Sequence, residues 1–174
     1  TVHSLQGIKQ ERWYDLPIDS PEVSFEKGVD PFKELFLDSV RIRMRSDVQL
    51  GSCLSGGLDS SSIVGAMREL SAESQISTIT SCSIYKEFDE SFFADQVVDF
   101  TNAKSAKVFP DPNSLSEKID DIIWHQDEPF GSASIYAQWC VFEKARDLGI
   151  PVMLDGQGAD ETHCGYNSFL RPYV

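Results

Sequence analysis

The sequence has 174 residues, with 28 acidic and 15 basic side chains and a formal net charge of −13 at pH 7. Its hydrophobic content of 41% suits one globular domain with a full core, which excludes a disordered chain. The negative charge argues against nucleic acid and anionic membranes as partners. Because there is also no signal peptide and no apolar run of about eighteen residues, we expect neither secretion nor membrane insertion.

The cysteines show no C-x-x-C pattern and no paired spacing; they are Cys53, Cys82, Cys140 and Cys164. We interpret them as free, buried thiols rather than as disulfides or metal ligands. Free thiols are typical of the reducing cytoplasm, where we expect the protein to be. The sequence starts at Thr1 instead of methionine, so we also expect a piece of a longer protein.

Residues 1–30 show no sustained periodicity. Within them, the segment 11–17 fits either a short edge strand or an irregular tail. Asp30 and Pro31 then predict the start of a helix, with the acid as its cap and the proline as its first residue. The buried side of this helix should carry apolar residues at helical spacing, namely Phe32, Leu35, Phe36 and Val40.

The central feature of the sequence is a strand that runs through a glycine turn into a helix. Apolar and small residues predict the strand over residues 47–54, and Gly56 and Gly57 follow it. From Asp59 onward the apolar residues have helical spacing, so the serines 60–62 fall in the first turn of the helix. Free N–H groups and the positive end of the helix dipole make such a turn an anion site.

The composition of this turn indicates how the anion would be bound. No lysine or arginine lies between Asp47 and Met67, and neither the Walker pattern nor a dinucleotide G-x-G-x-x-G pattern is present. Asp59 would repel a phosphate unless a divalent cation lay between them. Mg²⁺ is the natural candidate, because it is held by one or two carboxylates together with phosphate oxygens.

The rest of the chain alternates strands and helices. Strands are predicted at 76–84, 104–109 and 150–154, and helices at 91–102, from Ser114 to about 125, and at 135–148. Phe92, Phe93, Val97 and Val98 should face inward from the first of these helices. The alternation predicts an α/β fold with a doubly wound parallel sheet of about five strands and helices on both faces.

A second glycine-rich loop follows the last predicted strand and covers residues 155–166. Because parallel strands end at one edge of a sheet, this loop should lie beside the first one. We predict that Asp59 and Asp160 hold one Mg²⁺ between them. The alternative role for Asp160 is that of a helix cap.

Two motifs carry a resemblance to a known family. Ser55–Ser61 resembles the SGGxDS pyrophosphate loop of ATP pyrophosphatases, and residues 155–166 resemble the S/D-G-x-G-[SA]-D-E-x-x-x-G-Y segment of the asparagine synthetase family. Between them, residues 127–132 and 134–138 are similar to the middle segment of that family. The resemblance covers approximately residues 31–166.

The resemblance implies an adenine nucleotide alpha hydrolase-like fold. It implies an ATP pyrophosphatase domain at 31–174, truncated at its C-terminus, and a linker at 1–30 from an absent N-terminal glutaminase domain. The implied ATP and pyrophosphate site consists of Cys53, Ser55, Gly56, Gly57, Asp59, Ser60, Ser61, Ser81, Asp155 and Gly156. The metal ligands would be Asp59 and Asp160, and the catalytic residues Gln157 and Glu128.

Gln157 departs from the glutamate that many members of the family carry at this position. A carboxamide cannot take a proton, so either Gln157 only orients a substrate or another group is the base. Glu128 fits either a contact with substrate or a surface loop. His163 and Cys164 also depart from the family pattern, but without a partner cluster they do not indicate a metal site or a nucleophile.

The reaction implied by the resemblance has two steps: the side-chain carboxylate of aspartate attacks MgATP and releases pyrophosphate, and ammonia derived from glutamine then gives asparagine and AMP. Two alternatives remain open. One is another acyl-adenylating amide ligase, similar to β-lactam synthetase, and the other is a nucleotide-binding fragment that is inactive alone. The implied partners are these small substrates, the glutaminase domain of the full-length chain and a second copy in a homodimer.

Overall fold

A computed structural model describes residues 2–4, 6–15 and 23–169 of the chain, and the side chains from residue 6 onward. The chain forms two units, residues 1–34 and 35–174. The first contains an antiparallel hairpin of β1 (Val2–Ser4) and β2 (Gly7–Lys9). Of the two alternatives for the segment 11–17, the irregular tail fits Glu11–Asp15, which have no regular structure, and the remaining residues of the segment lie outside the described ranges.

The helix α1 (Phe25–Arg43) begins earlier than predicted and carries Pro31 in its interior. The carbonyl of Ser24 accepts hydrogen bonds from the backbone N–H groups of Lys27 (3.1 Å) and Gly28 (3.0 Å), which closes a first turn upstream of the proline. Pro31 donates no hydrogen bond, and it did not mark the first helical residue here.

The second unit is built on a four-stranded parallel sheet, rather than on the predicted five strands. Its strands are β3 (Leu50–Cys53), β4 (Ser77–Ser81), β5 (Lys104–Val108) and β6 (Val152–Leu154), in the order β5-β4-β3-β6. Along the chain, β4 pairs with one edge of β3 and β5 then pairs with β4. The last strand, β6, pairs with the other edge of β3. This order creates a switch point between β3 and β6, where open α/β sheets bind ligands.

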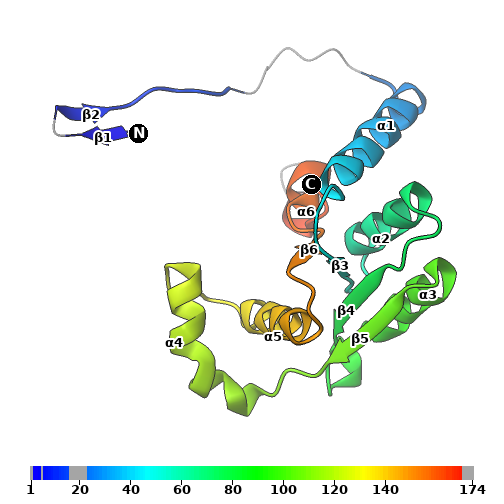
Figure 1. Ribbon diagram of the computed structural model, residues 1–174. Helices are drawn as coiled ribbons and strands as arrows, with labels where there is room; N and C mark the ends of the chain where they lie inside the picture. Colours follow the sequence, from blue (N-terminus) through cyan, green and yellow to red (C-terminus); the bar gives the residue numbers. More distant parts are fainter. Residues whose placement is uncertain (1, 5, 16–22, 170–174) are drawn as a thin grey trace. The chain divides into compact units, whose positions relative to one another are not determined.

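Helices cover both faces of the sheet, which confirms the predicted fold class (Figure 1). The helices that follow β3 are α2 (Leu58–Leu70), α3 (Ser91–Thr101), α4 (Leu115–Gln126), α5 (Ala133–Asp147) and the short α6 (Ala159–His163). On one side α2 and α3 contact β3 and β4, on the other α5 contacts β4 and β5, and α4 packs against α5. Two short 3₁₀ turns lie at Lys86–Phe88 and Pro112–Ser114. None of the helices within the described ranges is long and apolar enough to cross a membrane.

Each face of the sheet has its own hydrophobic core. On one face Leu54, Val64 and Met67 pack with Val40 of α1. On the other, Ile79 of β4 packs with Val141 and Ala145 of α5. Leu54 and Leu154, directly after β3 and at the end of β6, belong to the first core, so this core holds the starts of the segments that follow both strands.

Several apolar residues predicted to be buried are instead exposed. Phe92 and Phe93 of α3 are 68% and 56% exposed, and Phe32 and Leu35 of α1 are 51% and 72% exposed. In α3, the side chains of Ala94 and Thr101 are buried, and Val97 and Val98 pack at the edge of the core. The helix is apolar on more than one side, so periodicity alone did not identify its buried face.

The four cysteines are free, as predicted, but their burial differs. Cys82 is buried directly after β4, whereas Cys53 and Cys140 are partly buried and Cys164 is exposed. Burial raises the pKa of the Cys53 and Cys82 thiols above the usual range, which disfavours their reactive thiolate forms.

Candidate functional site

The turn between β3 and α2 is shaped by two serine side chains. The hydroxyls of Ser55 and Ser60 lie 3.0 Å apart, the backbone N–H of Ser55 donates to Ser60 Oγ (3.2 Å), and that of Gly57 donates to Ser55 Oγ (3.1 Å). Because α2 begins at Leu58, the N–H groups of its first turn have no partner within the helix. Serine hydroxyls therefore hold the shape of the turn, and backbone donors remain for an anion.

The other two serines at the start of α2, Ser61 and Ser62, do not shape the turn in this way. Ser62 Oγ donates to the carbonyl of Leu58 (2.7 Å). Ser61 Oγ is buried without a partner among the described residues, and Ser61 does not line the pocket described below.

Glycine is required at position 56 for two reasons. Gly56 has a φ of +92°, which is strained for other residues, and a Cβ at this position would lie 2.7 Å from the backbone nitrogen of Ala94 and 2.8 Å from Cβ of Phe93. The turn thus packs directly on the start of α3.

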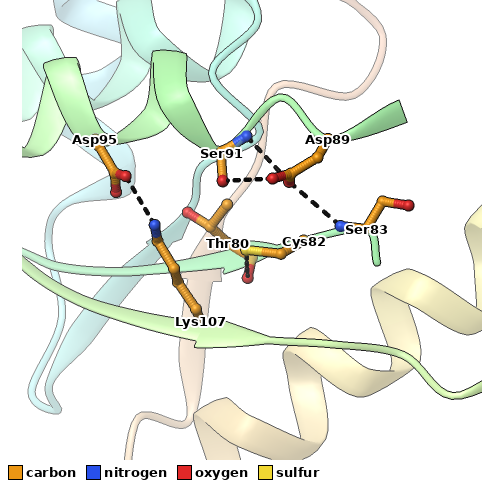
Figure 2. A network of polar contacts seen from close by, with 7 residues as sticks. All are labelled: Thr80, Cys82, Ser83, Asp89, Ser91, Asp95 and Lys107. Atoms are coloured by element: carbon orange, nitrogen blue, oxygen red, sulfur yellow. Dashed lines mark hydrogen bonds and ion pairs between the residues drawn. The ribbon is translucent and has the colours of Figure 1, made fainter. Parts of the chain in front are cut away.

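The start of α3 is in turn held by Asp89 (Figure 2). Asp89 Oδ1 accepts from the backbone N–H groups of Ser83 and Ser91, both at 3.3 Å, and Oδ2 accepts from the Ser91 hydroxyl at 2.9 Å. The hydrogen bond from the Ser91 hydroxyl is the main reason why the pKa of Asp89 is lowered. Next to it, Lys107 of β5 pairs with Asp95 of α3 at 2.8 Å.

The second glycine loop, which follows β6, touches the first. A Cβ on Gly156 would lie 3.0 Å from the backbone nitrogen of Ser60 and 3.1 Å from Cβ of Asp59. The Ser52 hydroxyl also donates to the carbonyl of Leu154 (3.2 Å), which joins the ends of β3 and β6. Two loops from distant parts of the chain therefore meet without space for a side chain between them.

The two loops and α5 enclose a pocket of about 310 Å³ at the switch point of the sheet. Of the predicted site residues, the lining includes Cys53, Ser55, Asp59, Ser60, Ser81, Asp155, Gly156, Gln157 and Asp160. Gly56, Gly57 and Ser61 belong to the turn but do not line the pocket. Glu128 is exposed and also lies outside the lining, after the left-handed residue Asp127 that ends α4.

Sequence reasoning missed several lining residues, among them Gln138, Glu161 and Tyr166. Gln138 Nε2 donates to Asp155 Oδ2 (3.0 Å), and the Tyr166 hydroxyl donates to Glu161 Oε1 (2.9 Å). Gln138 and Tyr166 stand in segments that carry the family resemblance, and that was the available signal. No spacing rule, however, connects Gln138 with an acid 17 residues further along.

The pocket is lined by four acids and, among the described residues, by no lysine, arginine or histidine. The acids are Asp59, Asp155, Asp160 and Glu161. This surplus of negative charge disfavours a polyanion in the pocket unless a cation compensates it. Asp59 and Asp160 supply the hard oxygen ligands that suit Mg²⁺, although no group of three potential metal ligands occurs among the described residues.

The Asp160 carboxylate lies against a glycine. The backbone N–H of Gly165 donates to the carbonyl of Asp160 (3.0 Å), and a Cβ on Gly165 would lie only 1.8 Å from Asp160 Oδ1. His163 and Cys164, between them in sequence, belong to no metal-binding cluster in the described part of the chain. His163 Nδ1 lies 3.0 Å from the carbonyl of Ala159, one helical turn back.

Comparison with known proteins identifies the family. The family model described as "Asparagine synthase" matches residues 31–174. The chain belongs to the asparagine synthase family. Residues 31–174 therefore carry the signature of this family, and the two glycine loops are the parts of it that meet at the pocket.

Two curated relatives in the asparagine synthase family illustrate the similarity. A protein of Methanocaldococcus jannaschii, provisionally named glutamine-hydrolysing asparagine synthetase 2, is 37% identical over 166 residues, which are 95% of this chain and 32% of that protein. Glutamine-hydrolysing asparagine synthetase 1 of Bacillus subtilis is 30% identical over 156 residues, 90% of this chain and 24% of its own length. The chain thus spans a third or less of these relatives.

More distant matches have other names. Amidase chyE of Penicillium rubens is 27% identical over 159 residues, covering 84% of this chain and 24% of that protein. Among solved structures, an NH₃-dependent NAD synthetase from Campylobacter jejuni aligns with a TM-score of 0.49 and 14% identity, covering 84% of this chain and 62% of that chain.

Proposed function

We propose that this chain carries the ATP-binding part of an amide ligase that forms asparagine. In this reaction the side-chain carboxylate of aspartate attacks the α-phosphate of ATP and releases pyrophosphate. Ammonia derived from glutamine then displaces AMP to give the amide. The proposed cofactor is Mg²⁺ and the proposed compartment is the cytoplasm.

One observation carries this proposal: two glycine loops of the asparagine synthase family meet at one acidic pocket. In the described part of the chain, no lysine, arginine or histidine lines this pocket. The first turn of α2 offers backbone N–H groups to a leaving pyrophosphate, and such donors stabilise charge that develops during the reaction. Ile79, Ala137 and Val141 form an apolar wall that fits a flat purine ring. The start of α2 thus suits the phosphates of the nucleotide, and the apolar wall of the same pocket suits its base.

Asp59 and Asp160 are the proposed ligands of the metal ion, since both line the pocket and both are hard oxygen donors. When bound, the ion supplies the positive charge that the lining lacks. Gln157 lines the same pocket, and its amide can orient the acceptor by hydrogen bonds but cannot remove a proton. We therefore assign Gln157 an orienting role and expect the base to be another group.

Residues 31–174 are proposed as the synthetase domain and residues 1–30 as a linker from a glutaminase domain, with a homodimer as the assembled form. Glu128, a proposed catalytic residue, is exposed outside the pocket and would reach substrate only if the chain around it changed position. The distant similarity to amidase chyE favours a second candidate, an acyl-adenylating ligase with a different acceptor. A third candidate is a fragment that binds ATP but is inactive alone.

ATP–pyrophosphate exchange by the full-length protein, measured against a panel of amino acids, tests the proposal. We expect exchange to depend on aspartate, because only the correct acceptor forms the adenylate. Asp160→Asn should reduce the exchange rate by at least about a hundredfold, since it weakens charge stabilisation in the transition state. Asp120→Asn, at an exposed acid of α4, is the matched control and should keep the rate.

If exchange depends on another carboxylic acid, that acid and not aspartate is the acceptor, and the second candidate is favoured. Exchange with no acid of the panel would contradict the adenylation step itself. An unchanged rate in Asp160→Asn would remove this residue from the reacting site.

A further inference from the structure

A second cavity, of about 490 Å³, lies between α1, α2 and β6. Its lining includes Ser39 and Arg43 of α1, which belong to the same unit as the sheet. Gln157, in the segment that follows β6, lines both this cavity and the pocket of the two glycine loops. The two spaces therefore adjoin at Gln157, the residue to which we assigned an orienting role.

Arg43 gives the cavity a charge that the pocket lacks. Among the described residues, Arg43 is the only lysine, arginine or histidine in the lining of the cavity, and it takes part in no ion pair. The one acid of the described lining is Asp155, which also lines the pocket and accepts a hydrogen bond from Gln138 of α5 (3.0 Å). An unpaired cation thus stands beside a pocket that carries four acids.

The guanidinium of Arg43 is oriented by its own helix. Nη1 donates to the carbonyl of Ser39 (3.0 Å) and to Ser39 Oγ (2.8 Å), so one end of the group is fixed. Within the described part of the chain, Nε and Nη2 donate to no other group. These two nitrogens form a side of the planar guanidinium that can bind both oxygens of a carboxylate at once. Arg43 is therefore preorganised as a carboxylate ligand.

The acceptor of the proposed reaction brings such a carboxylate. Aspartate reacts through its side-chain carboxylate, which must lie at the nucleotide, and it keeps an α-carboxylate that needs a separate partner. Inside the pocket, the acids at positions 59, 155, 160 and 161 repel this second charge. In the cavity, Arg43 attracts it, and hydrogen bonds to charged groups are about twice as strong as those between neutral ones.

We propose that Arg43 binds the carboxylate of the acceptor that does not react, and that the site thereby selects amino acids with two carboxylates. The acceptor then extends from the cavity past Gln157, with its reacting end at the nucleotide. The inference rests on the proposed function, because it needs an acceptor that is activated in the pocket. Arg43 acts as a specificity residue and takes no part in the chemistry of the nucleotide.

ATP–pyrophosphate exchange by the full-length protein tests the inference with aspartate and with β-alanine, which keeps the reacting carboxylate and lacks the other. The wild type should prefer aspartate by at least about a hundredfold in kcat/KM, because β-alanine leaves Arg43 without its partner. Arg43→Gln should raise the KM for aspartate by about tenfold or more, with little change in the KM for MgATP. The same variant should lose little with β-alanine, so the preference for aspartate falls. Arg43→Lys, which keeps the charge without the planar fork, should lie between the wild type and Arg43→Gln.

The matched control is Arg41→Gln, on the same helix, because Arg41 pairs with Asp38 and does not line the cavity. This variant should keep the wild-type KM for aspartate. If β-alanine supports no exchange, the KM values for aspartate and MgATP decide.

An unchanged KM for aspartate in Arg43→Gln overturns the inference. An equal loss with aspartate and β-alanine also overturns it, because it shows a structural role only. A rise in the KM for MgATP alone overturns it too, because Arg43 then contacts the nucleotide. Exchange that depends only on acids with a single carboxylate overturns the inference but leaves the adenylation step intact, whereas exchange with no acid contradicts the proposed function itself.

Discussion

At the scale of single residues, the contact between Gly165 and Asp160 allows a test of whether Asp160 binds a metal ion together with Asp59. The φ of Gly165 is not in the positive region, so alanine at this position causes no backbone strain. Its Cβ would instead collide with the Asp160 carboxylate, 1.8 Å away. The end of an aspartate side chain can rotate away at small cost. The same Cβ would lie 3.1 Å from the Cα of Asp160, so the backbone there must also shift slightly while the carboxylate leaves its position.

We predict that Gly165→Ala lowers the affinity for MgATP by about tenfold or more, because it displaces one ligand of the proposed metal ion. The melting temperature without nucleotide should change little. Gly131→Ala is the matched control, since a Cβ there meets no atom within 4 Å and its φ is also not positive. Calorimetry measures both variants, and an unchanged affinity in Gly165→Ala would mean that Asp160 does not bind the ion.

The hydrogen bond from Gln138 to Asp155 is a feature of the site that could not be predicted from the sequence. Asp59, Asp155 and Asp160 follow strands through glycine turns, so the topology alone predicted that they would meet. The contact from Gln138 depends on the rotation of α5 about its axis and on the distance of α5 from the sheet. Neither quantity follows from residue spacing within a helix whose apolar residues are distributed over several sides.

At the scale of elements, the connection from β4 to α3 supports the phosphate turn. Asp89 bonds both ends of this connection, at Ser83 and Ser91, and α3 packs on Gly56 (Figure 2). These hydrogen bonds favour the ionised form of Asp89 and lower its pKa in the folded state. The resulting stabilisation is fully present above the pKa of the unfolded chain, and it is lost as the pH falls through the lower pKa of the folded chain.

We therefore expect Asp89→Asn to reduce the free energy of unfolding most at neutral pH. The difference between wild type and variant should narrow below a pH of about 4, where the unfolded chain takes up the proton. Urea unfolding from pH 7 down to pH 3 measures the difference, and Asp120→Asn, at an exposed acid of α4, serves as the control with a small difference at pH 7. If the difference in the free energy of unfolding between the wild type and Asp89→Asn stays constant with pH, the assigned hydrogen bonds are contradicted.

The boundaries of the elements were predictable only where local chemistry determined them. Runs of β-branched residues and the glycine turns predicted all four parallel strands, although β6 is shorter than its apolar run. Pro31 misled the prediction of α1, because proline at the start of a helix is a statistical preference, and here the helix continues through it. Phe92 and Phe93 were misjudged because an apolar side chain indicates burial only where a neighbouring element covers it.

At the scale of the whole molecule, the acidity of the chain continues into the pocket. The net charge is −13, and among the residues that the structure describes the pocket lining offers no lysine, arginine or histidine to neutralise a triphosphate. ATP should therefore bind only as its magnesium complex, and EDTA should abolish binding even at millimolar ATP. This expectation distinguishes the site from P-loop sites, where a lysine contacts the phosphates directly.

The measurement is thermal unfolding with ATP, with MgATP and with magnesium alone. At a hundred times its dissociation constant, MgATP should stabilise the folded protein by about 2.7 kcal/mol, whereas ATP with EDTA should add nothing. Asp59→Ala should remove most of the MgATP effect, and the control Asp120→Ala should retain it. Equal stabilisation by ATP with and without magnesium would show that the phosphates are neutralised in another way.

The pairing of β6 with β3 also determines when the site can exist during synthesis. Ser52 and Leu154, joined across these strands, are 102 residues apart in the chain. At typical ribosomal speeds of about 5–20 residues per second, β6 therefore follows β3 only after several seconds, during which β4 can pair with one edge of β3 while the other edge stays unpaired. During that interval the nascent chain offers an open strand edge, a template for pairing with other chains, directly beside its future phosphate turn. The pairing of β6 closes that edge and brings the second glycine loop, which follows β6, to the pocket.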